Sequence, residues 1–354
     1  MTELIRRLDH SRYRVHVVCL RKEGAWLAQV ESRAASVVEF RISSFTKMAT
    51  LKQLWRFAQW CRRERIAVLH TCDFYSNIFG LLGGALAGVP VRVGSRRDLN
   101  PDKTSGQIRL QRLAYRFAKR VVANSPAAAA ILRLEGVPSD RVVMIPNGVD
   151  AAAYEEKIAR PDVRQVITVA NLRPEKNHES LIAAAAQLAS TCPNLRYQIV
   201  GEGTRRPALE HLARSRGVDH LIEFLGHRED VPALLAAADL FVLPSRSEAF
   251  PNGAIEAMAA GLPVVACAVG GLLDLVETGR TGILVPPSDP EPLAAAIRSL
   301  YDDPARAREM GLAARSEVRA QYSFERMVAA FDDLYDTELR ARHLLHAETA
   351  EAGI

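Results

Sequence analysis

Short runs of β-branched and other apolar residues alternate along the chain with longer segments rich in Ala, Leu and Arg. The runs predict a first series of buried strands at residues 15–20, 67–71, 91–94, 121–123 and 142–145. They predict a second series at residues 166–169, 197–200, 222–225, 240–243, 264–266 and 283–285. The intervening segments predict helices, among them residues 48–63, 180–190, 205–216 and 291–300. This alternation indicates an α/β protein whose helices cover both faces of parallel sheets.

The break between the two series predicts two domains. Pro146, Asn147 and Gly148 supply turn residues at the break, and a polar stretch follows at residues 154–164. We therefore expect a first Rossmann-like domain at residues 1–150 and a second at residues 151–322. A helix at residues 323–345 is long enough to pack back toward the first domain. In doubly wound sheets ligands bind beyond the carboxyl ends of the strands, so the two domains are expected to face a cleft.

The charge of the chain is distributed unevenly. The net charge of +5 combines a first part, residues 1–148, with 25 Lys and Arg against 11 Asp and Glu, and a remainder with a net charge of −9. A basic first half suits an anionic membrane face or an acidic substrate, and is equally compatible with a plain solvated surface. Nucleic acid is not expected as a partner, because no helix-turn-helix, RNP or zinc-finger signature accompanies the basic residues.

Cysteine usage and hydropathy favour a cytoplasmic protein, which can also associate peripherally with the inner face of the membrane. The five cysteines lie far apart without a CxxC pair, which is typical of buried thiols in a reducing compartment and predicts no metal site. The start MTELIRRLDH has no apolar run of the secretory kind, and the weakly polar stretch 78–91 is too short to span a bilayer.

The segment SEAFPNGAIEAMAA is the sharpest candidate for a binding site. A predicted strand leads into it, Pro251, Asn252 and Gly253 form a turn, and a helix is expected from residue 254. The free N–H groups at a helix start attract anions. Glu248 before the turn and Glu256 inside the helix do not suit phosphate, but carboxylates accept hydrogen bonds from sugar hydroxyls.

A second candidate loop, VANLRPEKNH, follows the first strand of the second series and precedes a helix near residue 177. Its Arg173 and Lys176 lie at the carboxyl end of that strand and are expected to face the same ligand as the turn at 250–253. Together these cations and N–H groups can neutralise a diphosphate, the leaving group when a nucleotide sugar is cleaved.

Other motifs in the chain are weaker evidence for a function. Gly201-Glu202-Gly203 lacks the third glycine of a dinucleotide fingerprint, and the chain has neither a P-loop nor a GxSxG elbow. His70 ends a predicted strand, where a structural role is the more common one.

These residues resemble glycosyltransferase family 4, the retaining nucleotide-sugar transferases of the GT-B fold. Glu248 to Glu256 matches the E-x7-E motif of that family, and VANLRPEK resembles its V-G-R-L-x-P-E-K pattern. The resemblance implies that Lys176 and the amides of residues 250–253 (Phe250, Pro251, Asn252 and Gly253) hold the phosphates and the donor sugar. It further implies that Glu256 binds the ribose hydroxyls and Glu248 the transferred sugar, and it implies no metal or other cofactor.

The chain departs from the family pattern at three places. The family arginine falls on Asn171, and we expect Arg173 to replace it. GSRRD stands where many members carry a histidine, which makes Asp98 our candidate to orient or deprotonate the acceptor hydroxyl. The family's first strand and Gly-rich loop have no counterpart before the helix ELIRRLDH, so we expect either a start codon further upstream or an impaired protein.

The combined expectation is a retaining hexosyltransferase that moves sugar from a UDP- or GDP-sugar to a polysaccharide, lipopolysaccharide or lipid-linked acceptor. A sugar-nucleotide epimerase or phosphorylase of the same fold is one alternative. A non-catalytic scaffold is the other.

Overall fold

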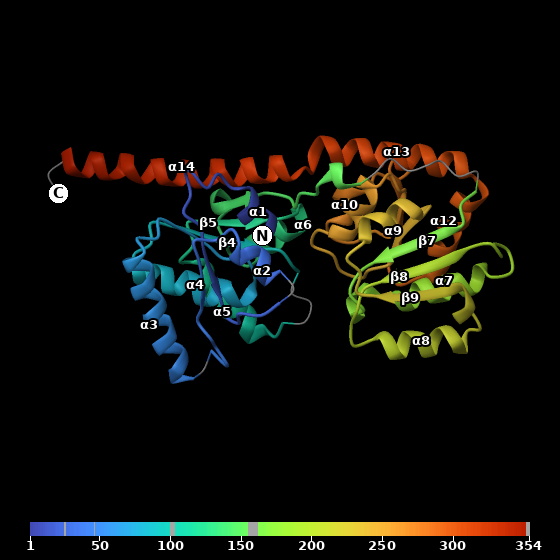
Figure 1. The fold of residues 1–354 in the computed structure, drawn as a ribbon, viewed down its shortest axis with the longest axis horizontal. Coiled ribbons are helices and arrows are strands. Elements are labelled where there is room, and N and C mark those ends of the chain that lie inside the picture. The colour runs from blue at the N-terminus through green and yellow to red at the C-terminus, as the bar shows by residue number, and fades with distance from the viewer. Residues whose placement is uncertain (25, 46, 100–102, 155–161, 352–354) are drawn as a thin grey trace. The chain divides into compact units, whose positions relative to one another are not determined.

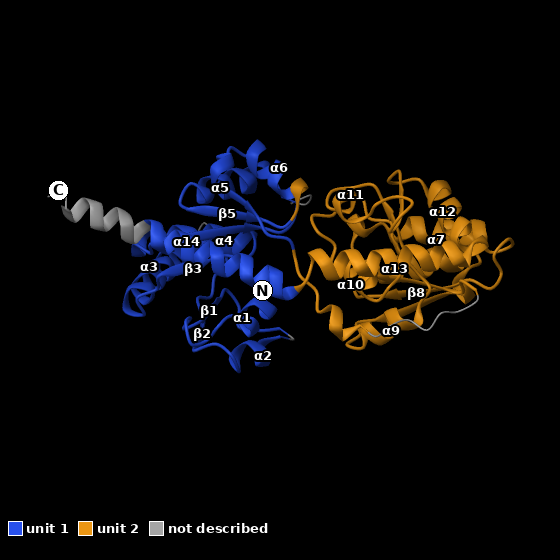
Figure 2. Cartoon of the chain, turned by 90° about the horizontal axis from the view of Figure 1, so that it is seen from above, with its two compact units in different colours: residues 1–124, 128–146, 324–354 blue, residues 125–127, 147–323 orange. Residues whose placement is uncertain are grey.

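The computed structural model describes residues 1–351 except 25, 46, 100–102 and 155–161, with side chains up to residue 341. It divides into two compact units, which Figure 2 draws in different colours. Unit 1 comprises Met1–Asn124, Ala128–Pro146 and Phe324–Ile354, and unit 2 comprises Ser125–Ala127 and Asn147–Ser323. Most of the polar stretch 154–164 that we expected between the domains lies outside the described residues.

Unit 1 has its parallel strands in two separate sheets. One has two strands in the order β1-β2 and the other has four in the order β3-β4-β5-β6. The strands are β1 (His16–Cys19), β2 (Ser36–Glu39), β3 (Val68–His70), β4 (Val91–Arg96), β5 (Arg120–Ala123) and β6 (Val142–Met144). The hydropathy pattern missed β2, a strand of four residues that stays partly exposed along its whole length. Among the described residues, β1 and β3 each pair with a strand on one side only.

Helices cover both faces of the four-stranded sheet (Figure 1). The helices of unit 1 are α1 (Thr2–Arg7), α2 (Leu27–Glu31), α3 (Met48–Arg63), α4 (Phe74–Ala87), α5 (Ser105–Tyr115), α6 (Pro126–Leu134) and α14 (Phe324–Glu351), of which α2 packs beside β2 of the two-stranded sheet. Leu4 of α1 and Phe331 of α14 pack with Val93 on one face. On the other face, α4, α5 and α6 pack against β5. Helix α3 joins this second layer through Phe57, which lies in one apolar cluster with residues of α4, β1 and β2.

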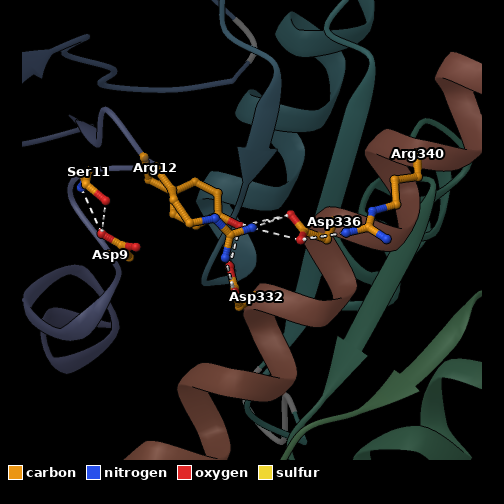
Figure 3. Close-up of polar contacts among 7 residues, drawn as sticks. Asp9, Ser11, Arg12, Asp332, Asp336 and Arg340 are labelled. Carbon is orange, nitrogen blue, oxygen red and sulfur yellow. Dashed lines mark hydrogen bonds and ion pairs between the residues drawn. The ribbon is translucent and has the colours of Figure 1, made fainter.

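A polar network fastens α14 to the segment before β1 (Figure 3). Arg12 donates to Asp332 at 2.8 Å and to both carboxylate oxygens of Asp336. The hydroxyl of Tyr13 donates to Asp332, and Arg340 forms a further ion pair with Asp336. The last helix of the chain is therefore part of unit 1 although it follows unit 2 in sequence.

His70 has a structural role within unit 1. Its Nδ1 lies 2.7 Å from the hydroxyl of Tyr335 on α14, and its Nε2 lies 2.7 Å from Oγ of Ser95 on β4. Burial lowers the pKa of His70 to about 3, so the ring is neutral near pH 7. The imidazole thus ties two strands to a helix that is remote in sequence.

This burial predicts a pH-dependent stability. The unfolded chain binds a proton on His70 below its ordinary pKa of 6.5, while the folded protein does not until about 3. The contribution of His70 to the free energy of unfolding is therefore expected to fall as the pH drops through this window, by at most about 1.4 kcal/mol per pH unit. His70→Gln is expected to remove that part of the slope in urea unfolding followed from pH 7 to pH 5. The same change at the exposed His220 is the control, and an unchanged slope in His70→Gln contradicts the prediction.

Unit 2 contains one parallel sheet in the order β12-β11-β10-β7-β8-β9. Its strands are β7 (Gln165–Val169), β8 (Arg196–Val200), β9 (Ile222–Gly226), β10 (Leu240–Leu243), β11 (Val264–Cys267) and β12 (Gly282–Val285). Its α-helices are α7 (His178–Leu188), α8 (Arg206–Ser215), α9 (Val231–Ala237), α10 (Asn252–Ala259), α11 (Leu272–Leu275), α12 (Pro290–Asp302) and α13 (Pro304–Gln321). The two-domain, doubly wound α/β architecture expected from the sequence is confirmed.

Successive residues of the central strands point into two different cores. On β10, Leu240 and Val242 belong to the cluster beneath α7, α8 and α12, while Phe241 and Leu243 belong to the cluster beneath α9, α10 and α13. All four side chains are buried, which explains why the strand reads as a continuous apolar run. No helix formed by the described residues is both long enough and apolar enough to cross a membrane.

Candidate functional site

The candidate site lies where the strand order of unit 2 reverses. β7 and β10 are neighbours, with Leu240 in register with Val166. β8 and β9 continue from β7 on one side, and β11 and β12 continue from β10 on the other. Loops that follow two such strands diverge and leave a crevice at their carboxyl ends, where doubly wound sheets bind ligands. The loops here are residues 170–177 after β7 and 244–251 after β10.

Direct hydrogen bonds hold these two loops together. The backbone N–H of Arg246 donates to the carbonyl of Glu175 at 2.8 Å. The buried side chain of Asn177 donates to the carbonyl of Pro244 at 3.1 Å. Asn177 has a φ of 52°, a left-handed conformation that asparagine adopts more readily than most residues. The relative position of the loops is therefore fixed by the fold of unit 2.

Lys176 and Glu248 meet at the centre of the two loops. Nζ of Lys176 lies 2.6 Å from Oε1 of Glu248, which also accepts a hydrogen bond from Oγ of Ser245 at 2.7 Å. The Glu248 side chain is only 6% exposed, whereas that of Lys176 is 21% exposed. An ammonium group has three N–H donors, so one can serve Glu248 while others remain for an anionic ligand. The two residues we predicted from separate motifs thus form one buried, charge-assisted contact.

The start of α10 adds backbone donors beside this pair. Pro251 precedes the helix, Asn252 and Gly253 open it, and within the described part of the chain no side chain caps that end. The first N–H groups of a helix have no intrahelical partner and carry partial positive charge. The preceding Phe250 is 9% exposed, and its ring centroid lies 5.5 Å from that of Tyr322. The packing of Phe250 therefore holds the turn in place, while the N–H groups at the start of α10 are the donors that a ligand can use.

Gly253 allows α10 to approach β7. A Cβ atom at this position would lie 2.4 Å from the carbonyl oxygen of Val169, and backbone cannot move aside cheaply. Gly253→Ala is therefore expected to lower the free energy of unfolding by about 1–3 kcal/mol and to weaken nucleotide binding. Gly106→Ala in α5 is the matched control for urea unfolding, because its new Cβ meets only Oγ1 of Thr104, at 4.0 Å. Equal losses in the two variants contradict this explanation.

Glu256 lies one turn inside α10 and is partly buried. Burial raises its pKa from an ordinary 4.5 to about 7. Tyr154 lies close enough that the charge of Glu256, together with burial, raises the pKa of its phenol. A carboxylate that is poorly solvated in the empty protein gains from hydroxyl donors supplied by a ligand.

Two further predicted residues are exposed. Arg173 precedes the short helix Pro174–Lys176, and its backbone N–H donates to the carbonyl of Asn171 at 2.9 Å. Asn171 is exposed as well, so the proposed replacement of one by the other stays a prediction. Asp98 belongs to unit 1 and follows β4, with its side chain 53% exposed and its carbonyl accepting from Nε of Arg96. Its role in proton transfer also stays a prediction.

The sequence did not reveal the residues that support the site. Ser245 and Asn177 were not singled out, and Asn147 was noted only as part of a turn. Nδ2 of Asn147 donates to Oδ1 of Asn252 at 2.8 Å, so this turn contacts the start of α10. A polar residue directly after a buried strand, as Ser245 is, was the one available signal.

The glycine pair at 201 and 203 has a packing role. A Cβ at Gly201 would lie 2.1 Å from the carbonyl oxygen of Ala170, and one at Gly203 would lie 2.3 Å from that of Leu172. The backbone after β8 therefore packs directly against residues 170–172, at the start of the loop that carries Lys176.

Each half of the chain matches the model of a known protein family. Residues 150–317 match the model "Glycosyl transferases group 1", and residues 1–148 match "Glycosyl transferase 4-like domain". The D-inositol 3-phosphate glycosyltransferase of Pseudarthrobacter chlorophenolicus is 32% identical over 285 residues, which cover 73% of this chain and 67% of that protein. The chain belongs to the group 1 glycosyltransferases. The resemblance based on the E-x7-E motif is thereby confirmed at the level of the family.

Another relative matches over a shorter span of the chain. The glycogen synthase of Mycobacterium tuberculosis is 37% identical over 209 residues, which cover 58% of this chain but only 50% of that enzyme. Among solved structures, HepE of Anabaena in complex with UDP-glucose superimposes with a TM-score of 0.83 at 24% identity, covering 95% of this chain and 96% of HepE. The sucrose-phosphate synthase of Thermosynechococcus elongatus gives a TM-score of 0.80 at 24% identity, with coverage of 96% and 92%. These structural similarities establish the GT-B fold.

Proposed function

We propose that this protein transfers a hexosyl group, with retention of configuration, from a UDP- or GDP-sugar to a carbohydrate or lipid-linked acceptor. The observation that carries the proposal is the contact of 2.6 Å between Lys176 and Glu248, beside the uncapped start of α10 at the switch point of unit 2. A cation and helix N–H groups suit a diphosphate, while buried carboxylates suit hydroxyls. A nucleotide sugar offers both kinds of group within one molecule.

In the proposed reaction, Lys176, Arg173 and the backbone N–H groups of Phe250, Asn252 and Gly253 bind the diphosphate. Glu256 accepts hydrogen bonds from the ribose hydroxyls, and Glu248 accepts them from the transferred sugar. As the bond between the anomeric carbon and the diphosphate oxygen breaks, negative charge grows on the leaving group. Positive groups that are already in place stabilise this charge in the transition state without a metal ion.

The acceptor hydroxyl attacks from the face that the diphosphate leaves. We propose that Asp98 orients this hydroxyl or takes up its proton, and that the departing diphosphate is a second base that can accept the proton. Because departure and attack share one face, the product keeps the anomeric configuration of the donor.

The names of related proteins support the class of donor and acceptor. HepE was crystallised with UDP-glucose. One relative, from Corynebacterium glutamicum, is a GDP-mannose-dependent phosphatidylinositol monomannoside mannosyltransferase. Others are glycogen synthases and D-inositol 3-phosphate glycosyltransferases. We propose a polysaccharide, lipopolysaccharide or lipid-linked acceptor, reached in the cytoplasm or at the inner face of the membrane, and no nucleic-acid partner.

The test is incubation of the purified chain with radiolabelled UDP- and GDP-sugars, with and without sugar and glycolipid acceptors. Transfer of label to an acceptor, with the donor's anomeric configuration by NMR, supports the proposal. A new sugar nucleotide would instead identify an epimerase, and a sugar phosphate formed with inorganic phosphate would identify a phosphorylase. If titration calorimetry detects no binding of either UDP or GDP, the result would favour a non-catalytic scaffold.

A further inference from the structure

The layer formed by α3, α4 and α5 lacks acidic residues. Asp and Glu account for 41 of the 354 residues of the chain, yet none occurs within the three helices. Helix α4 packs against both α3 and α5, and all three lie on the side of the sheet away from α14 (Figure 1). The outward side of this layer is therefore either neutral or basic along its helices.

Helix α3 exposes a row of large apolar side chains on this side. Its inner face buries Leu54, Phe57 and Cys61. Beside this face, Met48, Leu51 and Trp55 are exposed, with Trp55 at 60%. Spacings of three and four residues place these side chains next to one another along a helix. Single exposed apolar residues are common on protein surfaces. A continuous row of them instead indicates a surface that binds another molecule or a membrane.

Basic residues accompany this row. Lys52 and Arg56 each follow an apolar member of the row and are themselves exposed. On α5, Arg109 and Arg112 are exposed beside Leu110 and Leu113, which are also exposed. Among the residues that the structure describes, none of these four cations forms an ion pair. Their charge is therefore available to an anionic partner. We call the nine residues Met48, Leu51, Lys52, Trp55, Arg56, Arg109, Leu110, Arg112 and Leu113 the α3–α5 face.

We propose that the α3–α5 face docks on the surface of an anionic lipid bilayer. Apolar side chains interleaved with Lys and Arg are the composition of helices that lie in a membrane interface. Tryptophan favours the level of the headgroups, where its ring is buried and its N–H stays hydrated. A polyanion such as RNA would pair with the cations and stack on Trp55, but would leave Met48 and Leu51 in water. An anionic bilayer offers charged headgroups to the basic residues and an apolar interior to Met48, Leu51 and Trp55.

This inference rests on the proposed function only in placing a lipid-linked acceptor at the same surface, and it can be tested without any sugar substrate. The first measurement is co-sedimentation of the full chain with vesicles. Binding is expected for an equal mixture of phosphatidylglycerol and phosphatidylcholine, but weak for phosphatidylcholine alone. Binding that ignores lipid charge would overturn the proposal.

Paired variants then locate the surface. Lys52→Glu combined with Arg56→Glu is expected to weaken binding at least 20-fold, since each basic residue contributes about fivefold at an anionic surface. The control combines Arg214→Glu and Arg319→Glu, two exposed basic positions of unit 2, and is expected to bind as the unmodified chain does. Leu51→Ser is expected to weaken binding, while Leu273→Ser in unit 2 is not; the two leucines are 57% and 58% exposed. Equal effects in a variant and its control contradict the assignment.

Tryptophan emission supplies an independent readout. Vesicles are expected to shift the emission to shorter wavelength, and Trp55→Phe is expected to abolish the shift. Trp26→Phe is the matched control, because Trp26 is also exposed, at 62%, but lies outside the α3–α5 face. A shift that survives in Trp55→Phe contradicts the proposal. So does tight binding to single-stranded RNA with none to vesicles.

Transfer to a soluble acceptor separates this proposal from the proposed function. The α3 variants are expected to keep that activity and lose vesicle binding. A chain that binds vesicles through the α3–α5 face but transfers no sugar would contradict the proposed function alone.

Discussion

Lys176→Met is expected to lower kcat for sugar transfer by about 100- to 1,000-fold, the usual effect of removing one preorganised group that stabilises developing negative charge. Nζ of Lys176 is held 2.6 Å from Glu248, so the ammonium group is fixed before any ligand arrives. Methionine keeps most of the side-chain volume and removes the charge together with its N–H donors. The measurement is kcat and KM with the donor identified by the substrate screen.

The same substitution is expected to destabilise the folded protein. Glu248 is 6% exposed and keeps only the hydroxyl of Ser245 as a described side-chain partner once the ammonium is gone. Leaving a buried charge without its counter-ion costs about 3 kcal/mol, reduced here because the lysine side is partly solvated. Glu248→Gln in the same chain is expected to restore most of the stability, because the unpaired charge disappears, but not the activity.

This double variant distinguishes a catalytic role from a structural one. If Lys176 only holds Glu248 in place, the Lys176→Met, Glu248→Gln protein should be as active as Glu248→Gln alone, whereas a further loss of activity in the double variant identifies a direct role of the ammonium group. Lys119→Met, at an exposed lysine of unit 1, controls for the loss of a positive charge in general. Transfer within about threefold of the unmodified rate in Lys176→Met would show that the ammonium does not stabilise the leaving group.

Glu256→Gln is expected to weaken nucleotide-sugar binding while making the empty protein more stable at pH 8. Burial raises the pKa of this carboxyl from 4.5 to about 7, so the folded protein holds its proton more tightly than the unfolded chain does. The contribution of Glu256 to the free energy of unfolding therefore falls as the pH rises from 4.5 to 7, by a total of about 3 kcal/mol, opposite in sign to the contribution of His70. Glutamine carries no charge, and this loss is expected to be absent from the variant.

The affinity for a nucleotide sugar, in contrast to the stability contribution of Glu256, should increase as the pH rises. The ionised carboxylate accepts hydrogen bonds from ribose hydroxyls more strongly than the protonated form, so affinity is expected to rise between pH 6 and pH 8. Glu256→Gln is expected to bind about 10- to 100-fold more weakly at pH 8, with the difference shrinking toward pH 6. Calorimetry with a nucleotide sugar avoids the titration of a terminal phosphate. Glu309→Gln at an exposed position of α13 is the control, and a pH-independent affinity in the unmodified chain would contradict the assignment.

The resemblance of the sequence to its family located the motifs, but the contacts within the site required the fold. Glu248 and Glu256 could be found because their spacing and the turn between them are local features. Lys176 could be found because it follows a predicted strand. That its ammonium group would pair with Glu248, 72 positions later, could not be read from either motif. Ser245 and Asn177 were missed because their partners come from another loop or from the turn itself.

The sequence by itself determined the local elements and the class of fold. The pattern predicted α3 at residues 48–63, and the helix has these bounds, because side chains three and four positions apart decide whether a helix has an apolar face. The strands of both units were predicted within one or two residues, with β2 as the exception. Burial on both faces makes such strands continuous apolar runs, whatever their neighbours are.

Only the tertiary structure decided which elements are neighbours and what their side chains then experience. The placement of β7 beside β10 brings Lys176 to Glu248. The packing of α14 against β3 and β4 encloses His70 and keeps it neutral, and burial at α10 raises the pKa of Glu256. The physical reason is that strand pairing and desolvation depend on groups distant in the chain, whereas helix and strand periodicity depend on residues a few positions apart.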